Sequence, residues 1–195
     1  MLQLINNYQT MELFKKGLTD GIPHFGNQNS KDLLQKIQPN SLEDLCVILS
    51  LDRENCEEIS ANYIFNKRSP KSIEYLHPLL KKYLKPTYGI LIYNEQLMAI
   101  LTSVACISIQ ESNLIRKALG KRHADNIKLY FQKFEVGCLN NPKFILGCTQ
   151  IDKPPRTVIL EIWNFLFTEV INTISFAYIV KHASESYLFA HEKTF

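Results

Sequence analysis

The chain has 195 residues, of which 46% are hydrophobic and 21% charged, and its formal net charge is +3 at neutral pH. This length suits one domain, or one domain with a small appendage, and the composition excludes an intrinsically disordered chain. The net charge is too small to indicate a nucleic-acid partner, so such a partner can be inferred only from where the charges lie.

The cysteines and the apolar runs indicate in which cellular compartment the protein is expected. Five cysteines are scattered along the sequence without a C-x-x-C pair or a histidine at zinc-ligand spacing: Cys46, Cys56, Cys106, Cys138 and Cys148. We expect a reduced cytoplasmic protein with buried thiols. Residues 1–10 do not resemble a secretory signal. The most apolar runs, Gly89–Tyr93 and Ile159–Phe167, are shorter than the roughly 18 residues that cross a bilayer, so no membrane span is expected.

Short amphipathic helices are predicted at the start of the chain: Gln9–Lys16, Ser30–Ile37, and Leu42 to about Asp52. Gly17 is expected to end the first of them. Ser30 and Ser41 are expected to cap the second and third, because a serine oxygen can accept a hydrogen bond from a backbone N–H of the first turn.

The middle of the chain contains a basic segment and an ambiguous apolar one. Asn66–Ser72 is rich in cations and lacks apolar periodicity, so we predict an exposed basic loop. A short helix then opens at His77 and Pro78 and runs through Tyr83. Gly89–Tyr93 ends in four apolar residues that periodicity assigns to neither strand nor helix.

Longer helices are predicted from Asn94 onward, and the fold class is therefore mainly α, with at most a minor strand near Gly89–Tyr93. The first of these helices is capped by Asn94 and runs to about Ala105, and the second is capped by Ser108, with Glu111 at capping-box spacing, and is ended by Gly120. A third helix is expected at His123–Gly137, followed by a connector at Asn140–Pro155. The last part, Val158–His191, is expected to form two apolar helices that separate near Asn172.

Positive charge is concentrated in Arg116–Lys133. This segment has six basic residues against the single acid Asp125, so its net charge of +5 exceeds that of the whole chain. Arg116 and Lys117 are placed near a helix end, next to Gly120–Arg122. Such a corner suits phosphate groups, because arginine offers a planar fork of donors and lysine a mobile point charge. The alternative is that these cations face water and complement the helix dipole.

Several catalytic signatures are missing from the sequence. The aspartates are isolated, without the Asp-x-Asp pair that could hold two metal ions for phosphoryl transfer. There is no phosphate-binding glycine loop, serine nucleophile motif or zinc-protease motif. The histidines are interpreted as core or surface residues. Neither a catalytic residue nor a metal site is predicted, and Tyr93–Gln96 by itself is an ordinary helix start.

Four segments carry a family resemblance: Glu74–Pro78 (EYLHP), Pro86–Ile90 (PTYGI), Tyr93–Met98 (YNEQLM) and Arg116–Lys121 (RKALGK). In this order and spacing they resemble the finger region of the alpha subunit of bacterial DNA polymerase III, a replicative polymerase. That region reads E-Y-L-H-P, then T-Y-G-I followed by Y-Q-E-Q-x-M, then R-R-A-M-G-K-K. Weaker similarity extends from Thr19 to the closing Tyr187–His191, so the resemblance covers nearly the whole chain.

The resemblance implies a polymerase finger domain at 41–195, preceded at 1–40 by a lead-in like the connection from palm to fingers, or one continuous domain 1–195. It implies contacts with incoming nucleotide triphosphate and template-primer DNA, and a polymerase palm or other replisome parts as partners. Catalytic carboxylates and Mg²⁺ would belong to the missing palm, so no cofactor is expected in this chain, which would be inactive alone. The implied nucleotide-phosphate residues are Arg116, Lys117 and Lys121; further candidates for contacts with the DNA backbone are Arg53, Lys67, Arg68 and Arg122; Tyr93, Glu95 and Gln96 belong to the family motif.

The chain departs from the family at polar positions. Arg53–Cys56 retains the arginine of the family's R-P-G-P but loses its turn, and His24–Asn27 replaces Q-F-E-S. Ile171–Ser175 replaces F-N-K-S-H and has no cation. A second reading therefore stays open, namely a diverged finger-fold protein that binds DNA or a partner without catalysis. The neighbouring coding sequence would separate the two readings, because an upstream palm with paired aspartates supports the first.

Overall fold

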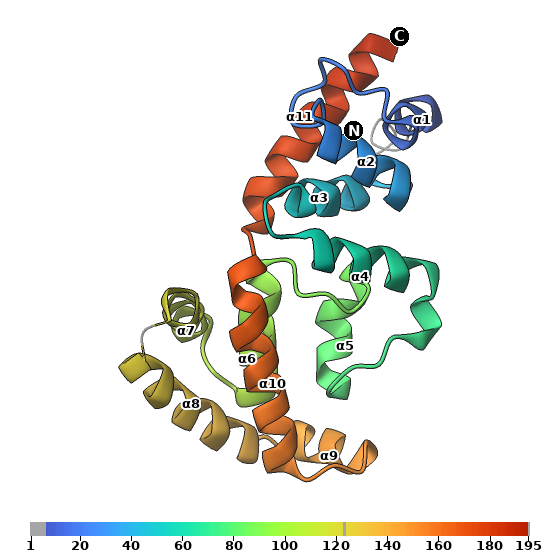
Figure 1. Ribbon diagram of the computed structural model, residues 1–195. Helices are drawn as coiled ribbons and strands as arrows, with labels where there is room; N and C mark the ends of the chain where they lie inside the picture. Colours follow the sequence, from blue (N-terminus) through green and yellow to red (C-terminus); the bar gives the residue numbers. More distant parts are fainter. Residues whose placement is uncertain (1–6, 123, 195) are drawn as a thin grey trace. The chain divides into compact units, whose positions relative to one another are not determined.

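The chain is mainly helical in the computed structural model, which describes residues 7–122 and 124–194 apart from the side chains of residues 125 and 194. Figure 1 shows helices joined by short loops, and no β-strand element is formed within these described ranges. The predicted mainly α fold class is confirmed. The ambiguous segment Gly89–Tyr93 is an irregular lead into the next helix.

The chain divides into two compact units. The first unit consists of two chain segments, one that ends at Pro70 and one that begins at Ile174, and the second unit is Lys71–Thr173. Both ends of the described chain thus contribute to the first unit. The domain boundary expected at residue 40 stays a prediction, and the division between these units falls at other residues.

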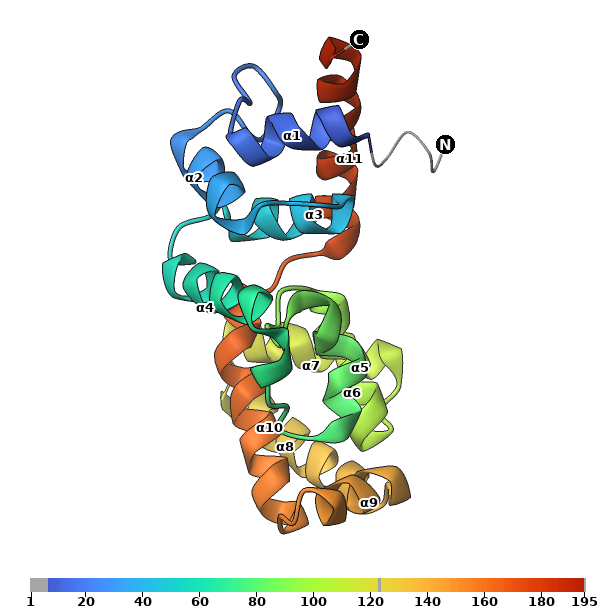
Figure 2. The same cartoon turned by 90° about the vertical axis from the view of Figure 1, so that its right-hand side faces the viewer.

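The described part of the first unit contains α1 (Tyr8–Lys16), α2 (Gln28–Ile37), α3 (Leu42–Leu51), α4 (Glu57–Arg68) and α11 (Phe176–Thr194). Figure 2 shows α1 and α3 beside α11, and both helices pack against it. Helix α2 contacts α1, α3 and α4.

An aromatic cluster joins α1 to α11. The ring of Phe14 packs edge-on against that of Phe25, with centroids 5.1 Å apart, and stacks with that of Tyr187 at 6.3 Å. All three rings are buried, and the Tyr187 hydroxyl accepts a 2.8 Å hydrogen bond from the backbone N–H of Asn7. Large aromatic side chains remove much apolar surface from water, which stabilises a unit of this size.

Polar residues start and end these helices. The side-chain oxygen of Asn7 accepts hydrogen bonds from two backbone N–H groups of α1, and Gly17 ends that helix with a φ of 68°. As predicted, the Ser41 hydroxyl caps α3 by accepting from the backbone N–H of Asp44 at 3.2 Å. These local signals act within a few residues, which is why the sequence reveals them.

The predicted cap at Ser30 is wrong. Asn27 caps α2 instead, because its side-chain oxygen accepts from the backbone N–H of Ser30 at 2.8 Å. The Ser30 hydroxyl donates to the Asp52 carboxylate. A tertiary contact therefore uses the side chain that sequence analysis assigned to a local one.

Helix α4 was not predicted. Only Ser60 and Tyr63 are buried on it, and Cys56 gives no side-chain cap, so the sequence shows no apolar stripe and no capping residue there, and the acids Glu57 and Glu58 of its first turn are a weak signal. The exposed loop predicted at Asn66–Ser72 is wrong for its first three residues, which form the last turn of α4. Pro70–Ser72 forms a short 3-10 helix.

The described part of the second unit contains α5 (Pro78–Leu84), α6 (Asn94–Ala105), α7 (Ile109–Lys121), α8 (Ala124–Leu139), α9 (Pro142–Gln150) and α10 (Pro155–Glu169), with short 3-10 helices at Lys85–Thr87 and Val170–Asn172. Helix α6 is central, since it packs against α5, α7, α8 and α9. Its predicted apolar face, Leu97, Ile100, Leu101 and Val104, is fully buried. The expected helix start at His123 lies outside the described residues.

Helix α9 occupies most of the predicted connector Asn140–Pro155, so that prediction is wrong. Pro142 stands at the first helical position, where its missing N–H would have no partner in the helix anyway. Asn141 caps the helix and also donates to backbone carbonyls at the end of α6. The proline thus marks a helix start rather than a loop.

His77 is a core residue, as one of the two interpretations held. Its Nε2 donates to the Phe144 carbonyl at 3.0 Å and its Nδ1 accepts from the Leu79 N–H at 3.1 Å, which fits one neutral tautomer. Burial lowers the pKa of His77, although the bond to Phe144 opposes the shift. A Cβ at Gly147 would lie 2.2 Å from Nε2, so this glycine permits the close approach of α9.

The cysteines are free thiols, and four are buried as expected, whereas Cys106 is exposed. Burial raises the pKa of the Cys46 thiol to about 12 and also raises the pKa of Cys138. These two thiols are therefore poor nucleophiles.

Within the described ranges, no single helix is long and apolar enough to cross a membrane. Helices α6 and α7 reach that length and composition only when taken together, and they meet at an angle of 119°.

Candidate nucleic-acid interface

Arg116 lies in a polar network on the second unit. Helix α7 is started by Ser108, whose hydroxyl accepts from the backbone N–H of Glu111 at 3.2 Å, as predicted. Two turns later, the half-buried Arg116 donates from Nε and Nη2 to the side-chain oxygen of Asn113 at 3.2 and 3.0 Å. Its Nη1 lies 3.5 Å from the side-chain oxygen of Asn94 on α6. The guanidinium is thus held by side chains of two helices.

The acceptors of Arg116 are neutral. Asn94 and Asn113 contribute amide oxygens, and the Asn94 oxygen also lies 2.7 Å from the hydroxyl of Thr173. No carboxylate of the described residues pairs with Arg116. Hydrogen bonds to neutral groups fix the guanidinium but leave its charge uncompensated, and a half-buried cation of this kind favours an anion as its partner.

Lys117 and Lys121 extend the positive surface along α7. Both side chains are exposed, and among the described residues neither forms an ion pair. Their spacing of four residues places them on one face of the helix. Arg116 is offset from Lys117 by about 100° around the axis, since a helical turn has 3.6 residues. The three predicted phosphate-binding residues therefore cover adjacent faces of one helix.

Arg122 is engaged with its own unit. It is the C-cap residue of α7 with a φ of 55°, and its guanidinium carbon lies 3.8 Å from the centroid of the Phe167 ring. Its Nη1 donates to the Phe167 carbonyl at 2.7 Å. Phe131, Trp163 and Phe167 help to line an apolar recess beside it, with a volume of about 530 Å³.

The predicted end of α7 at Gly120 is wrong. The helix continues through Gly120 to Lys121, and Arg122 supplies the left-handed residue that ends it. Arg116 and Lys117 therefore lie before the last turn. Lys133, which was counted in the basic segment, forms an ion pair with Glu111, and this contact raises its pKa. The positive surface therefore contains fewer uncompensated cations than the net charge of Arg116–Lys133 suggests.

The family-motif residues shape the start of α6, and the predicted cap at Asn94 is wrong. Tyr93 is the N-cap residue, and the side-chain oxygen of Gln96 accepts from the backbone N–H groups of Ile92 and Tyr93 at 2.9 Å. The Gln96 amide also donates to the Tyr83 carbonyl at 2.9 Å. Gln96 thus fixes the helix start and leaves the Asn94 side chain free to meet Arg116.

Glu95 and Tyr93 lie on either side of Asn94 in this motif. Glu95 is exposed in the first turn of α6, where an acidic side chain complements the helix dipole. Tyr93 is buried. The motif therefore supports the network around Arg116 through Gln96, which fixes the helix start beside Asn94.

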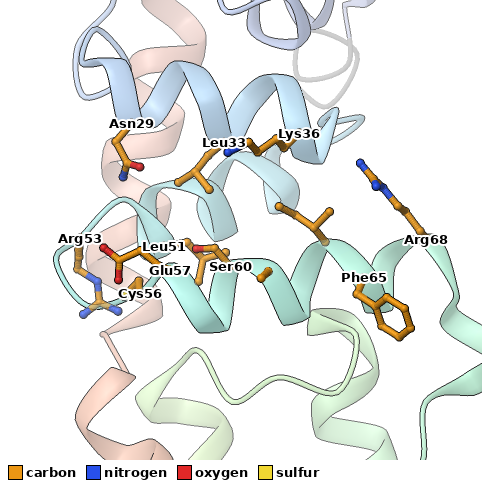
Figure 3. A pocket seen from close by; sticks show the side chains of 12 residues that line it. Asn29, Leu33, Lys36, Leu51, Arg53, Cys56, Glu57, Ser60, Phe65 and Arg68 are labelled. Atoms are coloured by element: carbon orange, nitrogen blue, oxygen red, sulfur yellow. The ribbon is translucent and has the colours of Figure 1, made fainter.

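A groove on the first unit contains two more of the predicted DNA contacts. It lies between α2, α3 and α4, has a volume of about 530 Å³, and includes the apolar side chains of Leu33, Leu51 and Ile64. Figure 3 shows Arg53 and Arg68 at opposite ends of this groove. Arg53 also donates from Nε to the Ser50 carbonyl at 2.6 Å, which fixes its side chain. The groove thus combines apolar side chains with cations at its ends, and Lys36 and Glu57 line it as well.

Comparison with known families assigns the chain. Residues 4–142 match the model of the bacterial DNA polymerase III alpha subunit finger domain. The chain belongs to this family. The resemblance predicted from the sequence is confirmed, and the match includes Asn94, Arg116, Lys117 and Lys121.

This chain is similar to several DNA polymerase III alpha subunits. It is 30% identical to that of Staphylococcus epidermidis over 181 residues, 92% of this chain and 17% of the relative. It is 32% identical to that of Staphylococcus aureus over 136 residues, 70% of this chain and 13% of the relative. It is 31% identical to that of Halalkalibacterium halodurans over 135 residues, which are 69% of this chain and 12% of the relative. The chain thus spans less than a fifth of the length of these curated relatives.

Lys67 has a structural partner in this finger domain. Its Nζ lies 2.8 Å from the carboxylate of Asp44, and the two side chains are only 14% and 13% exposed. The same carboxylate accepts from the backbone N–H of Asn40 at 2.8 Å. Arg68 is exposed, whereas the Lys67 side chain is largely buried and forms an ion pair with Asp44. Its predicted contact with DNA stays untested, but the neighbouring charge disfavours it.

Sequence reasoning missed the residues that hold Arg116. Asn113 stands three residues before it, a helical spacing that could have indicated the contact. Asn94 was assigned to a cap, and Thr173 belongs to Ile171–Ser175, the segment noted only for its missing cation. Both are distant from Arg116 in sequence, so only the fold brings them together.

Proposed function

We propose that this chain serves as the finger segment of a bacterial replicative DNA polymerase. In this role Arg116, Lys117 and Lys121 contact the phosphates of an incoming nucleotide and of template-primer DNA. The observation that carries the proposal is the half-buried guanidinium of Arg116, which is held by neutral oxygens and has no counter-ion among the described residues.

The chemistry of the three cations suits phosphate. A guanidinium fixed by side chains of two helices needs little further ordering when an anion arrives, so less conformational entropy is lost on binding. Lys117 and Lys121 add exposed mobile charges on the neighbouring face. Contacts to phosphate oxygens position nucleic acid without reading its bases, so we expect little sequence preference.

Catalysis is assigned to residues outside this chain. The sequence has no Asp-x-Asp pair, and phosphoryl transfer by polymerases depends on carboxylate-held metal ions. We propose that a palm supplies these carboxylates and the Mg²⁺ they hold, with the palm or other replisome parts as protein partners. The pure chain with Mg²⁺ and a primed template should then incorporate no nucleotide, and detectable primer extension would refute this assignment.

A second candidate function rests on the segment Ile171–Ser175. It has no cation or histidine where the resemblance implies both, and its Thr173 instead orders the Asn94 side chain. A finger-fold protein that binds DNA or a partner without assisting a polymerase would need the network around Arg116, including Thr173, but not the cation and histidine that the resemblance implies for this segment. Binding of DNA without competition by nucleotide triphosphate would favour this second function.

The test is a competition experiment with labelled primed DNA, followed by fluorescence anisotropy. For the wild-type chain we expect binding that dATP reverses, because both ligands present phosphates to the same cations. The double variant Arg116→Gln/Lys117→Gln should bind about tenfold more weakly, which corresponds to about 1.4 kcal/mol.

A matched control removes the same charge elsewhere on the second unit. The variant Lys81→Gln/Lys82→Gln changes two exposed lysines of α5 and should keep close to wild-type affinity. Circular dichroism confirms that each variant is folded. Equal loss of affinity in both double variants would show a response to net charge alone and would contradict a specific phosphate site.

A further inference from the structure

Three potential metal ligands meet on the first unit. His24 lies in the loop between α1 and α2, and His182 and Glu185 lie on α11. One potential ligand atom from each residue lies within 4.8 Å of the other two. His24 is far from the other two in sequence, so the fold alone creates this group.

The loop that carries His24 is fixed against α11. The buried Ser186 has its hydroxyl oxygen 2.7 Å from the carbonyl oxygen of Pro23 and 2.8 Å from that of His182. Within the loop, the hydroxyl of Thr19 donates to the Phe25 carbonyl at 2.5 Å. The backbone on both sides of His24 is therefore held in place.

The two ligands on α11 already have a suitable separation. His182 and Glu185 are three residues apart and share one helix face. Nδ1 of His182 lies 3.4 Å from the Glu185 carboxylate; it is inaccessible to solvent and has no hydrogen-bond partner among the described residues. Two ligands of a tetrahedral zinc ion lie about 3.3 Å apart when metal–ligand bonds are about 2.0–2.1 Å. This pair could therefore take up such an ion with little movement.

The imidazole rings are packed together. The ring centroids of His24 and His182 lie 4.4 Å apart, and the Tyr178 ring packs on His182 at the same distance. Tyr178 thereby restricts the orientation of the His182 ring. Lys181 competes for Glu185 only weakly, since its Nζ lies 4.0 Å from the carboxylate and its side chain is 70% exposed.

We propose that His24, His182 and Glu185 bind a Zn²⁺ ion that ties the loop between α1 and α2 to α11. Two imidazoles and one carboxylate are ligands that zinc accepts, and water would take the fourth tetrahedral position. Mg²⁺ prefers a shell of oxygen ligands and is disfavoured by the two imidazoles. The ion would stabilise the first unit, and it takes no part in phosphate binding by α7.

The test is calorimetric titration of metal-free protein with ZnCl₂, and separately with MgCl₂. All proteins carry Cys106→Ser, which removes the exposed thiol as a competing zinc ligand. We expect one Zn²⁺ per chain, a higher melting temperature with Zn²⁺, and no response to Mg²⁺. Substitution with Co²⁺ should give the visible absorption of a tetrahedral ion.

Two variants probe the ligands directly. His182→Gln and His24→Asn should each weaken Zn²⁺ binding by about tenfold or more, because even loss of residues that only support metal ligands has effects of that size. Asparagine suits position 24, since the φ of His24 is 63° and asparagine tolerates this conformation. His24 is exposed, so His24→Asn should fold even if His182→Gln does not.

His191→Gln provides the matched control, because it removes another imidazole from α11. This variant should bind Zn²⁺ like its parent. Unchanged Zn²⁺ affinity in folded His24→Asn would overturn the proposal. Loss of binding in His191→Gln, or absence of binding in the parent, would overturn it equally.

Discussion

Arg116 on α7 and Lys67 on α4 are both cations in the later part of a helix, but their surroundings differ. Arg116 is half-buried, and its hydrogen-bond partners are the neutral amides of Asn94 and Asn113. Lys67 is largely buried and faces the carboxylate of Asp44 at 2.8 Å. The charge of Lys67 is therefore compensated inside its unit, whereas that of Arg116 is left to attract an anion.

This difference shows what a basic stretch in a sequence does not reveal. Both residues were selected because cations cluster around them. The partners that decide between a structural and a binding role come from other helices. A charge that is compensated inside the protein is not available to a ligand, and loss of one partner leaves a costly buried charge.

The largest expected effect is on stability and concerns Asp44. Asp44→Ala leaves the ammonium of Lys67 without a counter-ion and removes the acceptor of the Asn40 N–H. We expect a loss of about 3 kcal/mol in the free energy of unfolding, the size found when a buried ion pair is broken. Urea denaturation measures this change.

Lys67→Met sharpens the comparison, since it replaces the ammonium by an apolar side chain of similar length. It should cost less stability than Asp44→Ala, because Asp44 keeps its bond from Asn40, and it should leave affinity for primed DNA unchanged. A clear loss of DNA affinity in folded Lys67→Met would show that Lys67 contacts DNA despite its ion pair.

The next effect is on affinity and concerns the support of Arg116. Asn113→Ala removes the acceptor of two guanidinium hydrogen bonds, so Arg116 must be ordered when a phosphate binds. We expect about fivefold weaker binding of primed DNA, near 1 kcal/mol, with little change in stability, as measured by anisotropy and urea denaturation. If affinity is unchanged, preorganisation by Asn113 is not part of the site.

The smallest effect tests the course of α7 through Gly120. Nothing lies within 4 Å of a Cβ built at this glycine, so Gly120→Ala should stabilise the chain by about 0.5–1 kcal/mol. Thermal unfolding followed by circular dichroism measures this change. Destabilisation by Gly120→Ala would instead indicate that the helix ends at Gly120, as the sequence predicted.

Much of the fold could be predicted from local signals. Asn94–Ala105 shows its apolar face in the sequence, and Ser41 and Ser108 cap the helices predicted for them. Helix α4 could not be predicted in this way, because it buries few residues. Helix α9 has a local start signal in Asn141 and Pro142, but its proline and glycine were interpreted as loop signals, and the glycine is required by the distant ring of His77.

The candidate site was predicted in part. The sequence indicates Arg116, Lys117 and Lys121 by charge and by resemblance, and all three lie on α7. It does not indicate the neutral partners Asn94 and Thr173, because tertiary contacts have no spacing that marks them in the sequence. For the same reason, the meeting of a loop histidine with two residues of α11 was not foreseen.

The central claim is that the Arg116 end of α7 binds phosphate, and the most direct measurement is the salt dependence of DNA affinity. Each phosphate contact contributes roughly 0.9 to the slope of log K against log salt. For Arg116→Gln/Lys117→Gln, we expect the slope between about 50 and 200 mM salt to flatten by about one to two units. Lys81→Gln/Lys82→Gln should keep the wild-type slope. An unchanged slope in the folded Arg116→Gln/Lys117→Gln variant would contradict phosphate binding and leave these cations as a solvated helix surface.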